Sequence, residues 1–263
     1  MRAQPANSSA MRNRFDAVTP IHRAGPHIMA ALRAAAVACP AQRPTDRARS
    51  SCARTSLHGQ VPNHRPAVRH LKAADPVMRR TIEQVGPCRL DAEQRPDVFH
   101  ALVRSIIYQQ LNGTAAGSIY RKFKGLYPER AFPRPQDILR TSDPQLRSAG
   151  LSPQKLSYLK DLSAKVEDGS VDLRGVRALD DEAVIEHLTQ VRGVGRWTAE
   201  MVLIFTLGRK DVLPVDDYGF RRAVSLAYKT RGLPKPDRLR KLAEPWRPYR
   251  SVATWYMWQS LTP

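Results

Sequence analysis

A helical spacing of apolar residues, which recurs from Pro76 to the end of the chain, is the feature that most limits the fold. In the segment FHALVRSIIYQQL, apolar residues return every three or four positions and so fall on one helix face. The same spacing recurs at residues 114–127, 152–166, 180–191, 196–208, 216–228 and 250–261. The short β-like run DVLPV is broken by Pro214, which cannot donate to a sheet. We therefore expect an all-α fold.

The first part of the chain, residues 1–72, has a different composition and is predicted to be a disordered leader. Lysine is absent before Lys72, while Arg, Pro, Ala and Ser are abundant and no helical stripe persists. An Arg-rich segment with few acids is also typical of an organelle transit peptide, and a start codon assigned too far upstream would look the same. The remainder, residues 73–263, is predicted to form one compact helical domain.

The net charge of the chain is +19, and it is not confined to the leader. The 11 arginines and two acids of residues 1–70 account for +9, so the remaining residues carry +10. A domain that is basic in its own right favours a polyanionic partner, most simply nucleic acid. No apolar run reaches the roughly 18 residues of a transmembrane helix, so a membrane partner is not expected. The cysteines Cys39, Cys52 and Cys88 lack the spacing of a disulfide framework, a zinc site or an iron–sulfur cluster.

A Gly-Val-Gly turn joins two of the predicted helices in the stretch VRGVGRWTAEM. Gly193 and Gly195 allow a tight turn in which the backbone can approach another group closely, with Val194 between them. The first amides of the next helix, beginning near Arg196, then point outward beside the positive end of the helix dipole. Such a helix start binds anions, and on DNA the anion is a phosphate, so Gly193, Val194, Gly195 and Arg196 are the predicted contacts with the DNA backbone. An ordinary helix–helix turn capped by glycine is the competing interpretation.

Several separate blocks resemble one family, and they occur in the same order. The segment LTQVRGVGRWTAEMVLIFTLGRKDVLPVDDYGFRRAV resembles the helix-hairpin-helix DNA glycosylases, and among them the alkylpurine (3-methyladenine) DNA glycosylases. SIIYQQLNGTAAGSIYRKF is similar to the family's earlier helix pair, AGLSPQKLSYLKDLS to its middle segment and WRPYRSVATWYMW to its C-terminal helix. The resemblance covers about residues 75–261 and implies the compact type without an N-terminal β domain. It also implies base excision repair on double-stranded DNA that contains damaged bases, by a monomer, in the cytoplasm or nucleoid of a bacterium or in the nucleus of a eukaryote.

The motif LPVDDY follows the hairpin by about 20 residues. Hydrolysis of an N-glycosidic bond develops positive charge on the sugar, and a fixed carboxylate stabilises that charge and can orient the attacking water. The resemblance implies that Asp217 is the catalytic carboxylate, with Asp216 as the alternative. Simple N-capping of the next helix is the competing interpretation, and one aspartate could cap while the other faces the pocket.

Trp197 occupies the position at which lyase-competent members of the family carry a lysine. Because an indole cannot form an imine, the resemblance implies a monofunctional enzyme that uses water and leaves an abasic site. An indole face also attracts a cationic alkylated purine by about 1–2 kcal/mol. Trp258, Tyr108 and Tyr218 are further candidates for the wall of the base pocket. For the tryptophans, burial in the core of an amphipathic helix is the competing interpretation.

The target base must leave the duplex, and a side chain must fill the gap that it leaves. The resemblance places this wedge after the SIIYQQL helix, at Gln110 or Leu111. It also implies no required cofactor, no iron–sulfur cluster and no metal held by side chains, although backbone carbonyls of the hairpin could hold K⁺ or Na⁺. Two alternatives stay open: a glycosylase for another damaged base, and a non-catalytic helix-hairpin-helix module that binds DNA.

Overall fold

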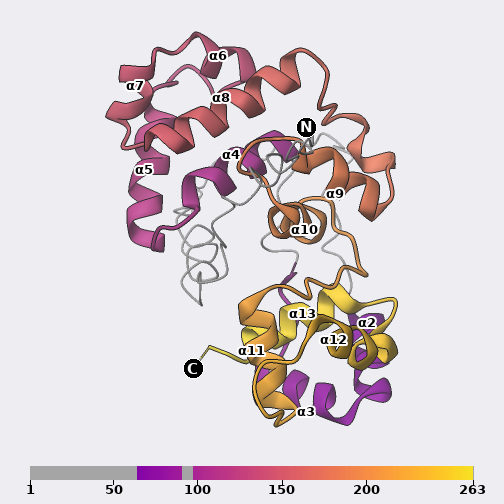
Figure 1. Cartoon of the computed structure of the whole chain (residues 1–263). Helices are drawn as coiled ribbons and strands as arrows, with labels where there is room; N and C mark the ends of the chain where they lie inside the picture. The colour runs from indigo at the N-terminus through magenta and orange to yellow at the C-terminus, as the bar shows by residue number, and fades with distance from the viewer. Residues whose placement is uncertain (1–63, 91–96, 263) are drawn as a thin grey trace, which may run out of the picture.

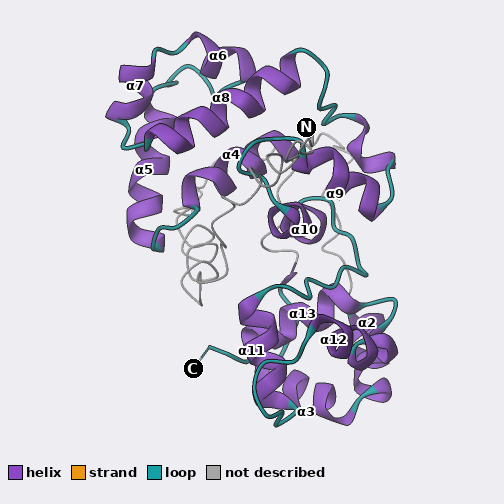
Figure 2. Cartoon of the chain, in the orientation of Figure 1, coloured by secondary structure: helices purple, strands orange, loops and turns teal. Residues whose placement is uncertain are grey.

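The structure is a computed structural model that describes residues 64–90 and 97–262. Within these ranges the regular elements are helices and no strand forms, so the all-α prediction is confirmed (Figure 2). None of the described helices is long and apolar enough to span a membrane. The elements are α2 (Arg65–Ala74), α3 (Pro76–Val85), α4 (Val98–Tyr108), α5 (Gly113–Gly125), α6 (Pro135–Arg140), α7 (Asp143–Ser148), α8 (Pro153–Glu167), η2 (Gly175–Ala178), α9 (Asp181–Thr189), α10 (Arg196–Phe205), α11 (Tyr218–Ala227), α12 (Pro236–Leu242), η3 (Glu244–Trp246) and α13 (Arg250–Gln259).

The helices form two groups, one above the other in Figure 1. The upper group contains α4 to α10, from the middle of the chain, with α8 packed against α4, α6 and α7. The lower group combines the N-terminal pair α2 and α3 with the C-terminal helices α11 to α13. The connection from α10 to α11 therefore passes from the upper group to the lower one, and the predicted catalytic aspartates lie in it.

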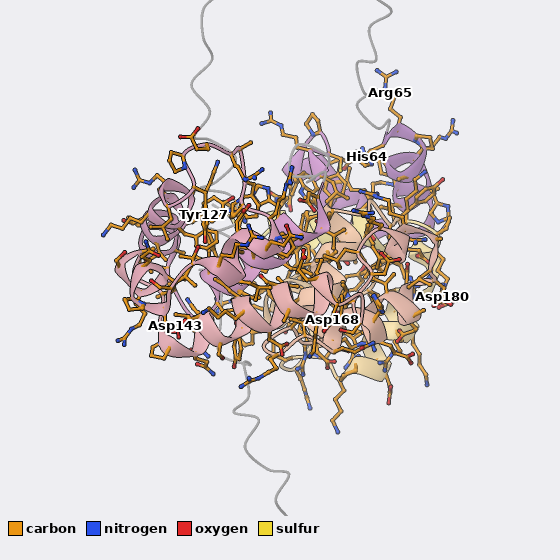
Figure 3. The ribbon with its side chains drawn as sticks, turned by 90° about the horizontal axis from the view of Figure 1, so that it is seen from above. His64, Arg65, Tyr127, Asp143, Asp168 and Asp180 are labelled. Atoms are coloured by element: carbon orange, nitrogen blue, oxygen red, sulfur yellow. The ribbon has the colours of Figure 1, made fainter. Side chains whose placement is uncertain are left out.

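Helix α2 corrects the predicted domain boundary between residues 72 and 73, which falls inside this helix. Ala67 and Leu71 lie one turn apart and are buried, and α2 packs against α3, α13 and η3. Such a short apolar stripe before Pro76 is a weak periodic signal, which explains why the sequence pattern missed it. His64 and Arg65 lie at the margin of the folded body (Figure 3). Residues 1–63 of the predicted leader lie outside the described residues.

Asp75 joins the N-terminal helix pair to the C-terminal helices within the lower group. Its carboxylate caps α3 by accepting hydrogen bonds from the amides of Val77 and Met78, at 2.8 and 3.1 Å. It also accepts hydrogen bonds from the Tyr228 hydroxyl and from Nε1 of Trp246, the latter at 3.0 Å. Burial acts to raise the pKa of Asp75, but these hydrogen bonds outweigh burial and lower it. The cap thus links α3 to the end of α11 and to η3.

Helix α8 begins as its sequence predicts and supports the upper group. Ser152 caps it and Pro153 is its first residue, an arrangement that needs no amide hydrogen at that position. Its leucines are buried, while Tyr158, Asp161 and Lys165 reach the turn between α9 and α10. The turn is therefore supported by a helix distant in sequence.

Candidate functional site

The Gly-Val-Gly turn connects α9 to α10 and is built so that only glycine fits at its first position. Gly193 has φ +80°, and a Cβ there would lie 2.2 Å from the ring of Tyr158. Val194 is buried, and its amide donates to the carbonyl of Val191 at 3.0 Å. Gly195 is the N-cap of α10 and has no side chain to satisfy the amides of the first turn. These amides therefore have no side-chain cap, and their binding of an anion stays a prediction.

Three side chains from other elements hold the backbone of this turn, and the sequence pattern identified none of them for this role. Asp161 Oδ2 accepts from the amide of Arg192 at 2.8 Å, and Lys165 Nζ donates to the carbonyl of Gln190 at 2.5 Å. Gln109 Nε2 donates to the carbonyl of Gly193 at 2.7 Å. The (i, i+4) spacing of the α8 pair was the only available signal, and such pairs are common on solvated helix faces. The turn is therefore fixed in place without any ligand.

Arg196, predicted to contact the DNA backbone, is engaged within the protein. Its guanidinium forms two hydrogen bonds with the carboxylate of Glu182, one of them 2.9 Å long, and lies 3.4 Å from Glu200. The hydrogen bonding of its guanidinium to the Glu182 carboxylate is the largest cause of the raised pKa of Arg196. A DNA phosphate would have to compete with these carboxylates, so a contact of Arg196 with DNA stays a prediction.

The carboxylate of Asp217 is fixed by three donors. Oδ1 accepts from Nε1 of Trp258 at 2.8 Å and from the amide of Phe220 at 2.5 Å, which makes Asp217 the N-cap of α11. Oδ2 accepts from Nε1 of Trp197 at 2.7 Å. Because a carboxylate oxygen accepts about two hydrogen bonds, Oδ1 is filled and Oδ2 retains one lone pair for a further group. One aspartate therefore both caps the helix and meets the tryptophans, while the neighbouring Asp216 is exposed.

The two indoles lie in different environments. Trp258, on α13, is only 4% exposed, and its ring stacks on Phe205 with centroids 5.9 Å apart. Trp197, near the start of α10, is partly exposed. Core burial therefore describes Trp258 well, yet its Nε1 still reaches Asp217. Only Trp197 combines a hydrogen bond to this carboxylate with an accessible surface, and stacking on a base stays a prediction for both.

The two predicted tyrosines also differ. Tyr108 is buried at the end of α4, with the guanidinium carbon of Arg104 4.2 Å from its ring centroid and Tyr120 packed edge-on. The ring of Tyr108 thus packs against residues of α4 and α5. Tyr218 is half-buried and directly follows Asp217 as the first residue of α11. A role of either ring in a base pocket stays a prediction.

Glu200 is a buried acid near Asp217 that the sequence analysis did not single out. It is 5% exposed and lies one turn beyond Trp197 on α10. Burial raises its pKa to about 7, Arg196 acts in the opposite direction, and the charges of Asp216 and Asp217 add to the increase. From the sequence alone, Glu200 could not be distinguished from an acid on the solvent-exposed face of the helix, because the sequence does not show that it is buried.

The loop between α4 and α5 carries both candidate wedge residues. Gln110 is exposed and has φ +58°, a left-handed conformation that is uncommon for residues other than glycine. Leu111 is half-buried and packs against the core. Of the two, Gln110 is the side chain that the structure presents to solvent, and the wedge role itself stays a prediction.

Comparison with known proteins identifies the family of this chain. The family model described as HhH-GPD superfamily base excision DNA repair protein matches residues 103–248, which include the hairpin and both aspartates. The chain belongs to this superfamily. The family predicted from the sequence motifs is thereby confirmed.

Individual relatives show which members of this superfamily the chain resembles. DNA-3-methyladenine glycosylase 1 of Schizosaccharomyces pombe is 32% identical over 193 residues, which cover 73% of this chain and 85% of that protein. A solved structure of the S. pombe enzyme in complex with abasic DNA matches with a TM-score of 0.65, over 73% of this chain and 95% of that one. The DNA-3-methyladenine glycosidase of Bacillus halodurans has 36% identity and a TM-score of 0.67, over 75% and 89% of the two chains.

Proposed function

We propose that this protein is a monofunctional DNA glycosylase of base excision repair that removes alkylated purines of the 3-methyladenine and 7-methylguanine type. The observation that carries the proposal is the carboxylate of Asp217, which three donors hold, among them Nε1 of Trp197, two residues after Gly195 of the turn. The 3-methyladenine glycosylases among the relatives support this substrate class.

The chemistry assigned to Asp217 follows from its geometry. An alkylated purine carries a positive charge, so the C1′–N bond can break without prior protonation, and its electron pair neutralises the leaving base. The sugar then develops oxocarbenium character, which a fixed, preorganised carboxylate stabilises. Water adds at C1′ and releases one proton to the solvent, and in this proposal the open lone pair of Oδ2 orients that water. The products are a free base and an abasic site.

The turn and the loop after α4 supply the DNA contacts in this proposal. The amides that open α10 bind a phosphate, and Gln110 fills the gap left by the flipped base. Trp197 occupies the lysine position of the lyase-competent family members, so we propose that the strand is not cut. We also propose that no cofactor is required. The carbonyl oxygens of the turn suit K⁺ or Na⁺ in kind, and those of Gln190 and Gly193 already accept one hydrogen bond each.

The test incubates the purified chain with duplexes containing 3-methyladenine, 7-methylguanine, hypoxanthine or 8-oxoguanine. Release of free alkylated purine, with strand breaks only after alkali, is expected. Asp217→Asn keeps a good N-cap, and we expect it to lower the single-turnover rate by about 10²- to 10³-fold while DNA binding persists. Asp216→Asn is the matched control and retains activity. Strand cleavage without alkali, or an imine trapped by borohydride, contradicts the monofunctional assignment, and full activity of Asp217→Asn contradicts the assigned carboxylate.

A further inference from the structure

The loop after α4 lies directly against the α9–α10 turn, although the two are far apart in the sequence. Gln109 and Gly193 are separated by 84 positions, and their hydrogen bond of 2.7 Å joins a side-chain amide to a backbone carbonyl. The bond ends at the residue whose φ of +80° defines the turn. The loop and the turn that precedes α10 are therefore direct neighbours in the fold.

A second hydrogen bond fixes the other side of the same loop. Lys155 Nζ, on α8, donates to the carbonyl of Ile107 at 2.7 Å, at the C-terminal end of α4. A cation at this end of a helix satisfies a carbonyl that has no partner within the helix. Burial lowers the pKa of Lys155 to about 8. Because α8 also contacts the turn through Tyr158 and Asp161, the loop and the turn share one support.

The tip of the loop is held in a conformation that costs free energy. Gln110 adopts the left-handed region with φ +58° and its side chain is exposed, while the amide of Leu111 donates to the carbonyl of Tyr108 at 3.3 Å and closes a tight turn around it. Gln109 directly precedes Gln110 in this turn. Its side chain therefore ties the tip of the loop to Gly193.

We infer that Gln109 is a positioning residue that couples the loop after α4 to the phosphate-binding turn. The residues that extrude the base and the backbone that binds the phosphate are then held in one fixed relative position. The inference rests on the proposed function. Gln109 itself touches no reacting atom in this assignment. It acts by fixing Gln110 relative to the turn that binds the phosphate. Loss of the Gln109 amide leaves the loop and the turn intact, but their position relative to one another becomes variable.

The amide is replaced in two ways that preserve its shape. Gln109→Glu removes the donor and places a carboxylate next to the carbonyl of Gly193, whereas Gln109→Met removes the donor without adding charge. Gln145→Glu is the matched control. It makes the same change in charge on α7, where the side-chain oxygen of Gln145 accepts a hydrogen bond from the amide of Ser142 at 3.3 Å, a bond that a carboxylate also accepts. Gln145 is exposed.

Five quantities are measured for each variant: the urea midpoint, affinity for an undamaged duplex, affinity for a duplex with an abasic site, single-turnover base release, and the fluorescence of 2-aminopurine beside the lesion, which reports extrusion. Both Gln109 variants are expected to keep the urea midpoint and the affinity for undamaged DNA. Base release and the preference for the abasic duplex each fall about tenfold, the effect of losing one hydrogen bond, and the fluorescence change shrinks with them. Gln145→Glu behaves as wild type.

Unchanged preference and rate in both Gln109 variants overturn the inference, as does an equal loss of affinity for both duplexes. A large fall in the urea midpoint also overturns it, because Gln109 would then be structural. If the wild-type chain releases no base, the proposed function fails. The affinity ratio and the fluorescence then still decide whether Gln109 couples the two contacts.

Discussion

Nε1 of Trp197 lies 2.7 Å from Oδ2 of Asp217, and this bond joins the two groups of helices at the point where the chain passes between them. Trp197 belongs to α10 in the upper group, while Asp217 opens α11 in the lower one. The other two donors to Asp217, from Trp258 and Phe220, both lie in the lower group and both use Oδ1. Trp197 therefore sets the position of the oxygen that retains a free lone pair.

Trp197→Phe is the first prediction, because it removes this donor and keeps an aromatic ring. We expect base release in a single turnover to fall about 10- to 100-fold, since Oδ2 loses the one donor that it has among the residues the structure describes. The urea midpoint should change little, because Trp197 is partly exposed. Trp258→Phe is the matched control and should reverse the pattern: a smaller loss of rate, because Phe220 still holds Oδ1, and a larger loss of stability. A wild-type rate in Trp197→Phe would contradict this assignment.

The sequence predicted α4, α5, α8 to α11 and α13, and the turn, because each is a local pattern. Apolar spacing marks a buried helix face, and glycine marks the turn where φ is positive. Asp217 was recognisable as a helix N-cap, although its hydrogen bonds to two tryptophans, 20 and 41 residues away, were not. The catalytic role of Asp217 rests on the family resemblance and stays a prediction.

The supports of the turn could not be predicted, because they come from distant parts of the chain. Asp161 and Gln109 reach it across 31 and 84 positions, and neither residue type carries a periodic signal. The pairing of Arg196 with Glu182 was also missed, because its partner lies 14 positions away. A basic residue beside a turn that is predicted to bind phosphate suggested a DNA contact instead. Helix α2 was missed because its apolar stripe is too short.

Gly193→Ala is the second prediction and concerns the turn. A Cβ at Gly193 would lie 2.2 Å from the ring of Tyr158, in a backbone region that non-glycine residues rarely adopt. Strain and overpacking together should destabilise the fold by about 2–4 kcal/mol and weaken binding to undamaged duplex DNA. Urea unfolding and a duplex titration measure the two effects.

Gly195→Ala serves as the control for this substitution. Gly195 has φ −99°, and nothing lies within 4 Å of a Cβ built there. Replacing glycine by alanine at this N-cap should change stability by no more than about 1 kcal/mol. If the two variants lose stability and DNA affinity equally, the special geometry assigned to Gly193 is wrong.

The third prediction concerns the pH dependence of stability that Glu200 imposes. Its pKa is about 7 in the folded protein, against an ordinary value of 4.5, chiefly because burial disfavours the charged form. Below pH 4.5 the group is protonated in both the folded and the unfolded state and has no effect. As the pH rises from 4.5 to 7, the unfolded state ionises first, so the free energy of unfolding falls. Above pH 7 the penalty is complete, at about 3 kcal/mol.

Glu200→Gln removes this titration while it preserves the shape of the side chain. We expect the difference in unfolding free energy between pH 5 and pH 8 to shrink by up to about 3 kcal/mol relative to wild type. Glu182→Gln, at the exposed partner of Arg196, is the control and should leave that difference nearly unchanged, because surface ion pairs contribute about 0–1 kcal/mol. Urea titrations at the two pH values provide the measurement. A pH profile of Glu200→Gln that overlays the wild-type profile would show that Glu200 ionises as an ordinary carboxyl in the folded protein.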